Sequence, residues 1–524
     1  MAEGRRDENQ DNGRVLVDSV GRIENFGVDF IPEEQRRSKP TNIFYILFGG
    51  SMTFGIIVIG WIPVSIGLGW WGSITSIIVG SAIGATLLAP MSLFGIRTGT
   101  NNPVASGAHF GAMGRLIGSI LGILACIVFA ALSVWAAGDV LAGSATRIFG
   151  GSEATLTLKL VAYTAVAIVM TIISVLGHAN MVAMTKYMIP SAGVLMVIAL
   201  FVLWPNFDAS YAGGDYLLGS FWPTWFLGAI SCAATIQSYG PYVGDWTRHI
   251  SREKYKDKQL MMVTWIGGFF GMGGAFAFGA YTAVSFNNPT APYVSEFVAA
   301  VPFWFLFPLL YIALVPGTAQ AVINIYSMGL DFSAIVTSLS RVQSTVILAA
   351  VSTVLVYLGA FYEHLEVLVS SFLGILVIMG APWVIINVIA FVNRKGYYYP
   401  DHLQVFNRGE IGGRYWFKNG LNIQATLAWL AAVISGSFFI NTGWYVGLGA
   451  KLFEGADIGL VVSMLVGAVV YIVLLYVMPE PKDAFGPQGA RFKSSSITGH
   501  EPIRKKGPVR KLNTITSEKT NISS

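Results

Sequence analysis

Residues 221–243, FWPTWFLGAISCAATIQSYGPYV, form an apolar stretch long enough to cross a lipid bilayer, but Tyr239-Gly240-Pro241 interrupts it near its end. A bilayer-spanning helix needs roughly 20 apolar residues, and a proline inside it removes a backbone hydrogen bond. Residues 42–66 form a second such stretch, which contains Gly49-Gly50-Ser51. Matched breaks of this kind are typical of transporters built from inverted repeats. The alternative is that the glycines allow close helix packing and that Pro241 only kinks its helix.

The composition extends this interpretation to the whole chain. Of its 524 residues, 54% are hydrophobic and only 12% are charged, about half the charged fraction of a typical soluble domain. An all-α polytopic membrane protein is therefore predicted. Twelve stretches have the length and apolarity of membrane spans: 42–66, 72–96, 116–142, 155–176, 187–205, 221–243, 260–286, 301–327, 343–360, 367–392, 423–440 and 456–478.

The two breaks suggest how the twelve spans are organised. If each repeat has five helices, spans one and six correspond, and the odd number inverts the second copy relative to the first. Spans eleven and twelve then lie outside the repeats. The predicted segments are an N-terminal tail (1–41), a first repeat (42–205), a second, inverted repeat (221–392), two further spans (423–478) and a C-terminal tail (479–524).

The basic residues indicate the orientation of the chain. Of the 33 Lys and Arg residues, all but Arg147, Lys159 and Lys451 fall in the tails or in loops on one side of the predicted spans. By the positive-inside rule, both termini and these loops are cytoplasmic. Localisation in the plasma membrane, with lipid as a partner, is expected. The C-terminal tail is expected to be solvated, and attraction of its basic residues to anionic lipid is the alternative.

Several other classes of function find no support in the sequence. The formal charge of +5 is explained by cytoplasmic anchoring, so no nucleic-acid partner is predicted. Cys126 and Cys232 both fall inside spans and suggest neither a disulfide nor a metal site. The chain has no HExxH, Walker-type or Gly-x-Ser-x-Gly motif, so neither an enzyme nor a bound cofactor is expected.

Several short motifs, taken in order, resemble the purine and cytosine permease family. They are Glu24-Asn25-Phe26-Gly27-Val28-Asp29-Phe30-Ile31-Pro32, Thr98-Gly99-Thr100-Asn101-Asn102-Pro103, Pro241-Tyr242-Val243-Gly244-Asp245-Trp246, Asn324-Ile325-Tyr326-Ser327-Met328-Gly329-Leu330 and Gly413-Arg414-Tyr415-Trp416. The resemblance implies a LeuT-like five-plus-five fold and import of a nucleobase or a related ring, of purine, cytosine, uracil, allantoin or hydantoin type, by cation symport. A same-fold symporter of an amino acid or other small metabolite, and a non-transporting nutrient sensor, are the alternatives.

The resemblance also places a substrate-stacking tryptophan in span three, at Trp135. Asp139 follows four residues later, so both side chains project from one face of the helix. An intramembrane carboxylate is costly and is a functional candidate by default. Asp139 can accept ring N–H groups or carry a proton, although family members often have a neutral amide there. The alternative is that Asp139 lies near the outer mouth and stays hydrated.

The remaining predicted substrate-binding residues lie at the two breaks, except for Gln320 in span eight. Gln237 and Tyr239 flank the second break, and the resemblance puts an aromatic residue that encloses the substrate at or near Tyr239. Gln237 offers both a donor and an acceptor, as an amide-like ring requires. Gly50, Ser51 and Gln320 complete the set. Ser51 stands where many relatives have an asparagine, and Ala321, beside Gln320, where the family supplies a ligand-binding asparagine.

The coupling ion is predicted to be H⁺ rather than Na⁺. The resemblance puts the sodium-binding hydroxyl groups of sodium-dependent relatives near Val315-Pro316, and neither of these side chains carries an oxygen. Thr318, two residues further on, restores a hydroxyl group if the alignment shifts.

Overall fold

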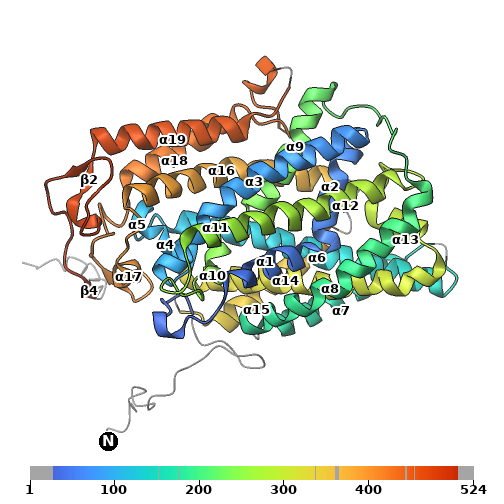
Figure 1. Cartoon of the computed structure of the whole chain (residues 1–524), viewed down its shortest axis with the longest axis horizontal. Helices are drawn as coiled ribbons and strands as arrows, with labels where there is room; N and C mark the ends of the chain where they lie inside the picture. Colours follow the sequence, from blue (N-terminus) through green and yellow to red (C-terminus); the bar gives the residue numbers. More distant parts are fainter. Residues whose placement is uncertain are drawn as a thin grey trace, which may run out of the picture.

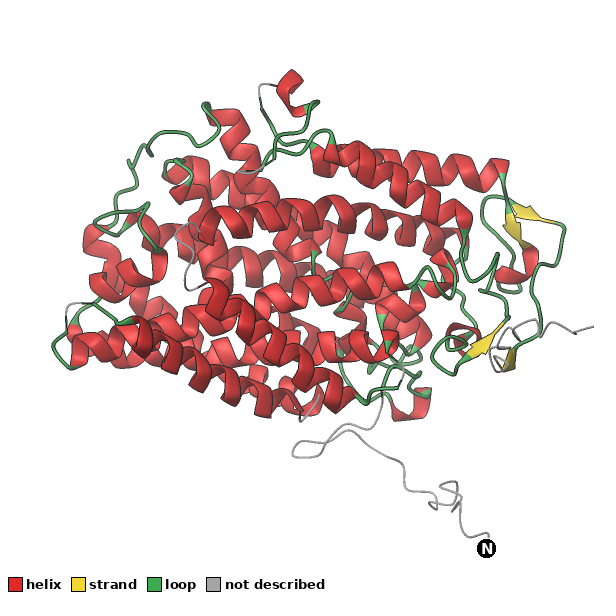
Figure 2. Ribbon diagram, turned by 180° about the vertical axis from the view of Figure 1, so that it is seen from behind, coloured by secondary structure: helices red, strands yellow, loops and turns green. Residues whose placement is uncertain are grey.

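The computed structural model describes residues 27–505, apart from 152, 176–177, 337, 360–364, 443–444 and 454. The outer parts of both predicted tails, 1–26 and 506–524, therefore lie outside the described residues, as do Glu24, Asn25 and Phe26 of the first family-like motif. Within the described chain the protein is a bundle of helices that run roughly side by side, with short strands at one end (Figure 1; Figure 2).

The helices follow the predicted spans closely. The first half contains α1 (Pro40–Ser51), α2 (Phe54–Ser65), α3 (Trp70–Thr98), α4 (Asn102–Ala105), α5 (Gly107–Phe110), α6 (Leu116–Ile148), α7 (Leu156–Val175) and α8 (His178–Leu203). The second half contains α9 (Phe221–Gln237), α10 (Val243–Thr247), α11 (Asp257–Ile266), a π-helix (Gly267–Met272), α12 (Gly273–Val284), α13 (Tyr293–Ala300), α14 (Leu306–Ile335), α15 (Arg341–Gly359), α16 (Leu365–Asn393), α17 (Pro400–Leu403), α18 (Ile423–Ser437) and α19 (Gly459–Val477). Single 3₁₀ turns join some of these elements.

The prediction of twelve spans is confirmed. In the described chain, eight continuous stretches of helix are long and apolar enough to cross a bilayer, and the pair α1 and α2 forms a ninth span that bends by 63°. The other three predicted spans correspond to α8, α18 and the interrupted pair α9 and α10. Both predicted breaks are present, because α1 ends at Ser51 and α9 ends at Gln237.

Close helix packing holds the two halves together. The central α14 packs most extensively against α6, while α3 packs against α9 and α2 against α12. The contact between α2 and α12 depends on Gly60, because the backbone of Phe276 leaves no room for a Cβ atom there. Small residues that let helix backbones approach are typical of membrane bundles. Close packing at glycine, which the sequence offered as the alternative explanation of the breaks, is thus present at Gly60 in α2.

The segments with the predicted cytoplasmic loops gather at one end of the bundle. Figure 1 shows α4, α5, α10, α17 and the strands at that end, and α13 at the other. The described start of the chain is attached to the same end, since the Ile31 N–H donates to the Gly99 carbonyl and Ser38 forms a β-bridge with Ile250. The segments that the charge pattern assigned to one side therefore lie together in space.

The C-terminal segment corrects one expectation. Residues 480–505 do not form a solvated tail, because they fold back onto the bundle through two small sheets. In one sheet, β2 (Glu480–Pro481) pairs in parallel with β3 (Ser494–Ser495), and in the other β4 (Arg504–Lys505) pairs antiparallel with β1 (Glu410–Ile411). Composition alone gave no indication of this packing, since the segment is rich in polar and basic residues.

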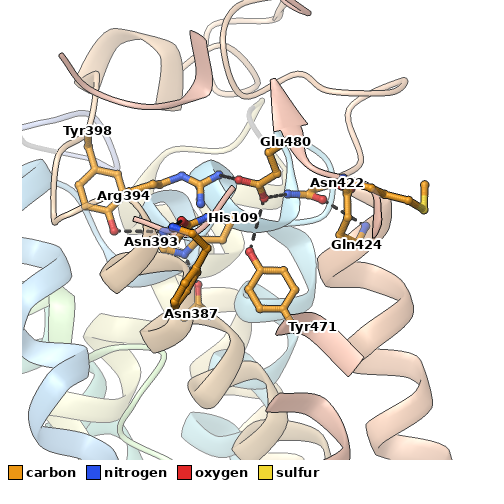
Figure 3. A network of polar contacts seen from close by, with 11 residues as sticks. His109, Asn387, Asn393, Arg394, Tyr398, Asn422, Gln424, Tyr471 and Glu480 are labelled. Atoms are coloured by element: carbon orange, nitrogen blue, oxygen red, sulfur yellow. Dashed lines mark hydrogen bonds and ion pairs between the residues drawn. The ribbon is translucent and has the colours of Figure 1, made fainter. Parts of the chain in front are cut away.

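A buried ion pair anchors this segment (Figure 3). The Arg394 guanidinium, just after α16, donates to the Glu480 carboxylate at 2.7 Å, and both side chains are fully buried. Asn422 Nδ2 also donates to Glu480, at 2.5 Å, and the Tyr471 hydroxyl donates at 3.4 Å. Burial lowers the pKa of Arg394, but the Glu480 carboxylate and smaller contributions from surrounding groups together outweigh burial, so the net pKa shift is upward. The Arg394 guanidinium therefore stays charged.

His109 of α5 lies beside this ion pair (Figure 3). Its Nδ1 lies 2.7 Å from Asn387 Oδ1, and its Nε2 lies 3.0 Å from the Tyr398 hydroxyl. The Asn387 amide nitrogen donates to the Trp383 carbonyl, so Asn387 Oδ1 accepts from Nδ1–H. Burial, with help from the positive charge of Arg394, holds the pKa of His109 well below its usual value. A neutral His109 thus fastens α5 to α16.

Candidate functional site

A side chain of α4 forms a hydrogen bond with the backbone at the break in span six. Between α9 and α10, the Gly240 carbonyl accepts from Asn102 Nδ2 at 2.7 Å. The same nitrogen donates to the Met91 carbonyl of α3 at 2.9 Å. An unsatisfied carbonyl inside a membrane protein is costly. Asn102, part of a family-like motif, therefore stabilises the unwound segment.

The break in span one brings α1 against α14. A Cβ atom on Gly50 would lie 2.9 Å from Gln320 Oε1 and 2.6 Å from Ile323 Cδ1, so only glycine fits without displacing them. The Ser51 hydroxyl donates to the Leu47 carbonyl one turn earlier in α1. Of the two residues predicted at this break, Gly50 thus contacts the Gln320 side chain, whereas the hydroxyl hydrogen of Ser51 is used within its own helix.

Gln320 and Tyr239 join α14 to the break in span six. Gln320 Nε2 donates to the Tyr239 hydroxyl at 2.5 Å, and both side chains are buried. The Tyr239 ring lies 6.4 Å from the Phe129 ring of α6 and 4.9 Å from the Tyr242 ring. Three predicted site residues, Gly50, Tyr239 and Gln320, are therefore brought together from three different spans.

Carboxamide atoms without a protein partner mark this region. The Gln237 side chain is buried, and neither its nitrogen nor its oxygen has a hydrogen-bond partner among the described residues. It lies against Gly380 of α16, where a Cβ atom would lie 3.0 Å from Gln237 Nε2. Gln320 Oε1 lacks a partner as well. Such groups are rare inside proteins and call for an explanation, such as a ligand that satisfies them.

Asn324 is a residue that sequence reasoning missed. It is fully buried, and both atoms of its carboxamide are without a partner in the described chain. It lies four residues after Gln320 in α14, hence on the same face. This spacing was visible in the sequence, but Asn324 was considered only as part of a family-like motif. Gly380 was missed too, because nothing in the sequence indicates that α16 packs against Gln237.

Trp135 and Asp139 occupy one side of α6, as their spacing predicts. The Trp135 ring is half-buried and packs against the hydrophobic core. Asp139 Oδ1 accepts from the Tyr163 hydroxyl at 2.5 Å and lies 4.0 Å from Lys159 Nζ. Both of these partners belong to α7. The contacts of Asp139 therefore connect α6 to α7 and do not include the other predicted site residues.

Side-chain hydroxyl groups are scarce where the resemblance puts the sodium-binding residues of sodium-dependent relatives. Val315 and Pro316 contribute none from their side chains. The Thr318 hydroxyl donates to the Leu314 carbonyl of its own helix at 2.5 Å. In the described residues, no group of three or more His, Cys, Asp or Glu side chains has the arrangement of a metal site.

Two interrupted spans, close to α6 and α14 and accompanied by buried carboxamides with unpartnered atoms, are typical of a secondary transporter. Residues 30–467 match the family model described as permease for cytosine/purines, uracil, thiamine, allantoin. The chain belongs to this permease family, as the sequence motifs indicated.

Individual relatives agree with this assignment. The chain is 27% identical over 472 residues to YxlA of Bacillus subtilis (strain 168), a candidate purine-cytosine permease, and the match covers 87% of this chain and 96% of the relative. Among solved structures it is similar to Mhp1, a nucleobase-cation-symport-1 family transporter with bromovinylhydantoin bound in a closed conformation. The TM-score is 0.67 at 18% identity, over 88% of this chain and 98% of Mhp1.

More distant structures share the same fold. A Na⁺-coupled sialic acid symporter matches with a TM-score of 0.55 at 13% identity, over 88% of this chain and 93% of the symporter. These likenesses confirm the predicted LeuT-like architecture of two inverted five-helix repeats followed by two helices.

Proposed function

We propose that this protein imports a nucleobase or a related nitrogen heterocycle across the plasma membrane, by symport with H⁺ and with both termini in the cytoplasm. The observation that carries the proposal is a set of three buried carboxamides with unpartnered atoms: Gln237 at the end of α9, Gln320 bonded to Tyr239, and Asn324 one turn further along α14. Each carboxamide can donate and accept. The lactam edges of purines, pyrimidines and hydantoins present the complementary pattern.

The substrates named for relatives support the same choice. The family model names cytosine, purines, uracil, thiamine and allantoin, and Mhp1 was solved with a hydantoin. Most of these compounds are flat rings with adjacent N–H and C=O groups. Trp135 and Tyr239 are proposed to contact the ring faces, since aromatic stacking adds about 0.5–1.5 kcal/mol beyond burial. Gly50, Ser51 and Asp139 complete the proposed site.

Binding and flux measurements test this proposal. The full-length protein in proteoliposomes is titrated with uracil, cytosine, adenine, hypoxanthine, allantoin and hydantoin, and uptake of the tightest binder is followed. At least one ring is expected to bind and to accumulate. If amino acids bind and none of the rings does, the protein transports another class of substrate with the same fold. If a ring binds but no net flux follows, the protein is a sensor.

Proton coupling is supported by the lack of side-chain oxygen on Val315 and Pro316 and by the bond of the Thr318 hydroxyl to its own helix. We expect uptake to follow an inward pH gradient and to continue when Na⁺ is replaced at constant pH. One proton crossing 100 mV supplies about 2.3 kcal/mol, enough for roughly 50-fold accumulation. Loss of uptake on removal of Na⁺ would instead point to a sodium site that includes Thr318.

A further inference from the structure

One face of α14 carries four polar side chains in a row, at positions Gln320, Asn324, Ser327 and Asp331. Spacings of four, three and four residues keep them on one side of the helix, and all four are buried. At 1.5 Å per residue, Asp331 lies about 16 Å along the helix from Gln320. The row thus leads from the candidate substrate site to a buried carboxyl group near α4 and α10.

Asp331 lies where four segments meet. Its Oδ1 accepts from Asn101 Nδ2 at 2.9 Å. Its Oδ2 faces Gly122 of α6, where a Cβ atom would collide with it, and Pro241 of the span-six break borders the same spot. Neither Oδ2 nor the neighbouring Ser327 hydroxyl has a hydrogen-bond partner in the part of the chain that the structure describes. One carboxyl oxygen is held in place, and the other is free to bind a proton.

The charged groups around Asp331 do not neutralise it. Arg115, just before α6, attracts the carboxylate, but it donates to the Ala334 carbonyl at 2.8 Å and to Asn407 Oδ1 at 2.6 Å. Asp245 of α10 repels the carboxylate. The Cys126 thiol of α6 is a further titratable neighbour. Among the described residues, no ion pair within 4.0 Å includes Asp331.

A buried carboxylate without a cationic partner carries a large desolvation cost, which binding a proton removes. Asp139, the other carboxyl group considered for proton transfer, is in a different position. Its oxygen already accepts from the Tyr163 hydroxyl and faces the Lys159 ammonium group. Asp331 is therefore the better proton acceptor of the two.

We propose that Asp331 binds and releases the coupling proton and that Asn101 positions its carboxyl group. The proposal rests on the proposed function and names the proton site of that transport. A proton that enters from outside forms an O–H bond at Oδ2, and this bond breaks when the proton passes to cytoplasmic water. The carboxylate is then restored, and one positive charge has crossed.

The position of Asp331 links this proton to the conformational cycle. Alternating access in this fold requires the two repeats to move against each other. Asp331 contacts α6 and the loop after α3 from the first repeat, and the span-six break from the second. A neutral Asp331 lets these segments close around it, whereas an ionised one favours an opening that admits water.

Asp331→Asn in proteoliposomes tests the proposal. We expect substrate binding within about threefold of wild type and continued exchange of labelled for unlabelled substrate. Accumulation driven by a pH gradient, and substrate-induced proton uptake measured with a pH-sensitive dye, should both be lost. Asp457→Asn is the matched control, since Asp457 is also buried but lies before α19, outside the site, and it should leave both signals intact.

The outcomes separate the two proposals. If wild type neither binds nor accumulates any ring, the proposed function fails. If wild type couples to protons and Asp331→Asn still does, Asp331 is not the proton site.

A second variant covers the case in which Asp331→Asn does not fold. Asn101→Ser keeps an oxygen to cap α4 but removes the amide donor to Asp331. The pH at half-maximal uptake should rise by about 0.5 to 1 unit, because the carboxylate loses one hydrogen bond. An unchanged pH profile in this variant would overturn the positioning role and, with it, the proposal.

Discussion

The three buried carboxamides with unpartnered atoms differ in what each would lose on substitution. Gln320 also bonds to Tyr239, so Gln320→Leu would leave the buried tyrosine hydroxyl without its partner. The Gln237 side chain is buried and forms no hydrogen bond with the described residues. A buried polar group without a hydrogen bond costs about 1–3 kcal/mol. The substrate-free protein therefore carries a cost at Gln237 that a ligand would relieve.

Gln237→Leu should consequently raise the melting temperature of the substrate-free protein while weakening substrate binding. One lost hydrogen bond of about 0.5–1.5 kcal/mol corresponds to roughly two- to thirteenfold in affinity. Thermal unfolding in detergent and equilibrium binding would measure the two effects. Gln320→Leu, the control, should lower the melting temperature. Unchanged affinity in Gln237→Leu would remove Gln237 from the site.

Trp135 has the size and position for stacking on a flat ring from α6. Trp135→Ala should weaken binding by about three- to tenfold or more, because stacking and burial are both lost. Trp135→Phe should retain part of the affinity. Trp225→Ala, near the start of α9 and away from the break, serves as the control for general loss of packing. Equal affinity in Trp135→Ala and wild type would assign Trp135 to core packing.

At the scale of elements, the approach of α1 to α14 depends on the lack of a side chain at Gly50. In Gly50→Ala the new methyl group would meet Ile323 Cδ1 and Gln320 Oε1. Overpacking of this kind typically costs about 1–3 kcal/mol, and it should also weaken binding by displacing Gln320. Ile323→Val removes Cδ1, so the double variant should recover part of the stability.

The control for this experiment is Gly274→Ala in α12. A Cβ atom on Gly274 meets nothing within 4 Å, so this helical substitution should not lower the melting temperature. A melting temperature for Gly50→Ala as high as that of Gly274→Ala would mean that α1 and α14 separate without cost.

The contact between α5 and α16 should make stability depend on pH through His109. In the folded protein the pKa of His109 lies well below its usual value, whereas in the unfolded chain it is about 6.5. The unfolded state therefore binds a proton more readily, and stability falls as the pH drops below about 6.5, by up to about 1.4 kcal/mol per unit. Above that pH the contribution is fully present.

Melting temperatures of wild type and His109→Gln between pH 7.5 and 5 test this dependence. The wild-type value should fall more steeply than that of the variant. The comparison is needed because burial raises the pKa of Asp457 to about 6, so its contribution to stability is lost as the pH rises through that value. Parallel curves for the two proteins would contradict the assignment to His109.

Sequence patterns predicted the elements well and their contacts less well. Hydrophobic runs and Tyr239-Gly240-Pro241 placed the spans and the breaks, because both depend on local composition. The partners of Asp139 were not predictable, since they depend on how α6 is rotated against α7. Gly380 was missed for the same kind of reason, whereas the position of Asn324 one turn after Gln320 was visible in the sequence and was overlooked. The buried Glu480 lies in a segment whose polarity resembles that of a solvated tail.

For the whole molecule, the grouping of basic loops at one end of the bundle allows a test of orientation. Ser251 in the loop after α10 is buried, so a cysteine there would react poorly on either side. Lys254 in the same loop is exposed, as is Asp208 on the other side of the predicted membrane. In intact cells, an impermeant thiol reagent should label Asp208→Cys and spare Lys254→Cys. The reverse pattern would invert the topology.

The Arg394–Glu480 pair also has a consequence for the order of synthesis. Glu480 leaves the ribosome after all twelve predicted spans have been made, so Arg394 and Asn422 lack this partner until then. A chain that terminates before Glu480 keeps all twelve spans but leaves a buried guanidinium uncompensated, a defect that typically costs about 3–5 kcal/mol. A chain that ends before Glu480 should therefore accumulate to a lower level in cells than the longer chain, because unstable proteins are removed by cellular proteases.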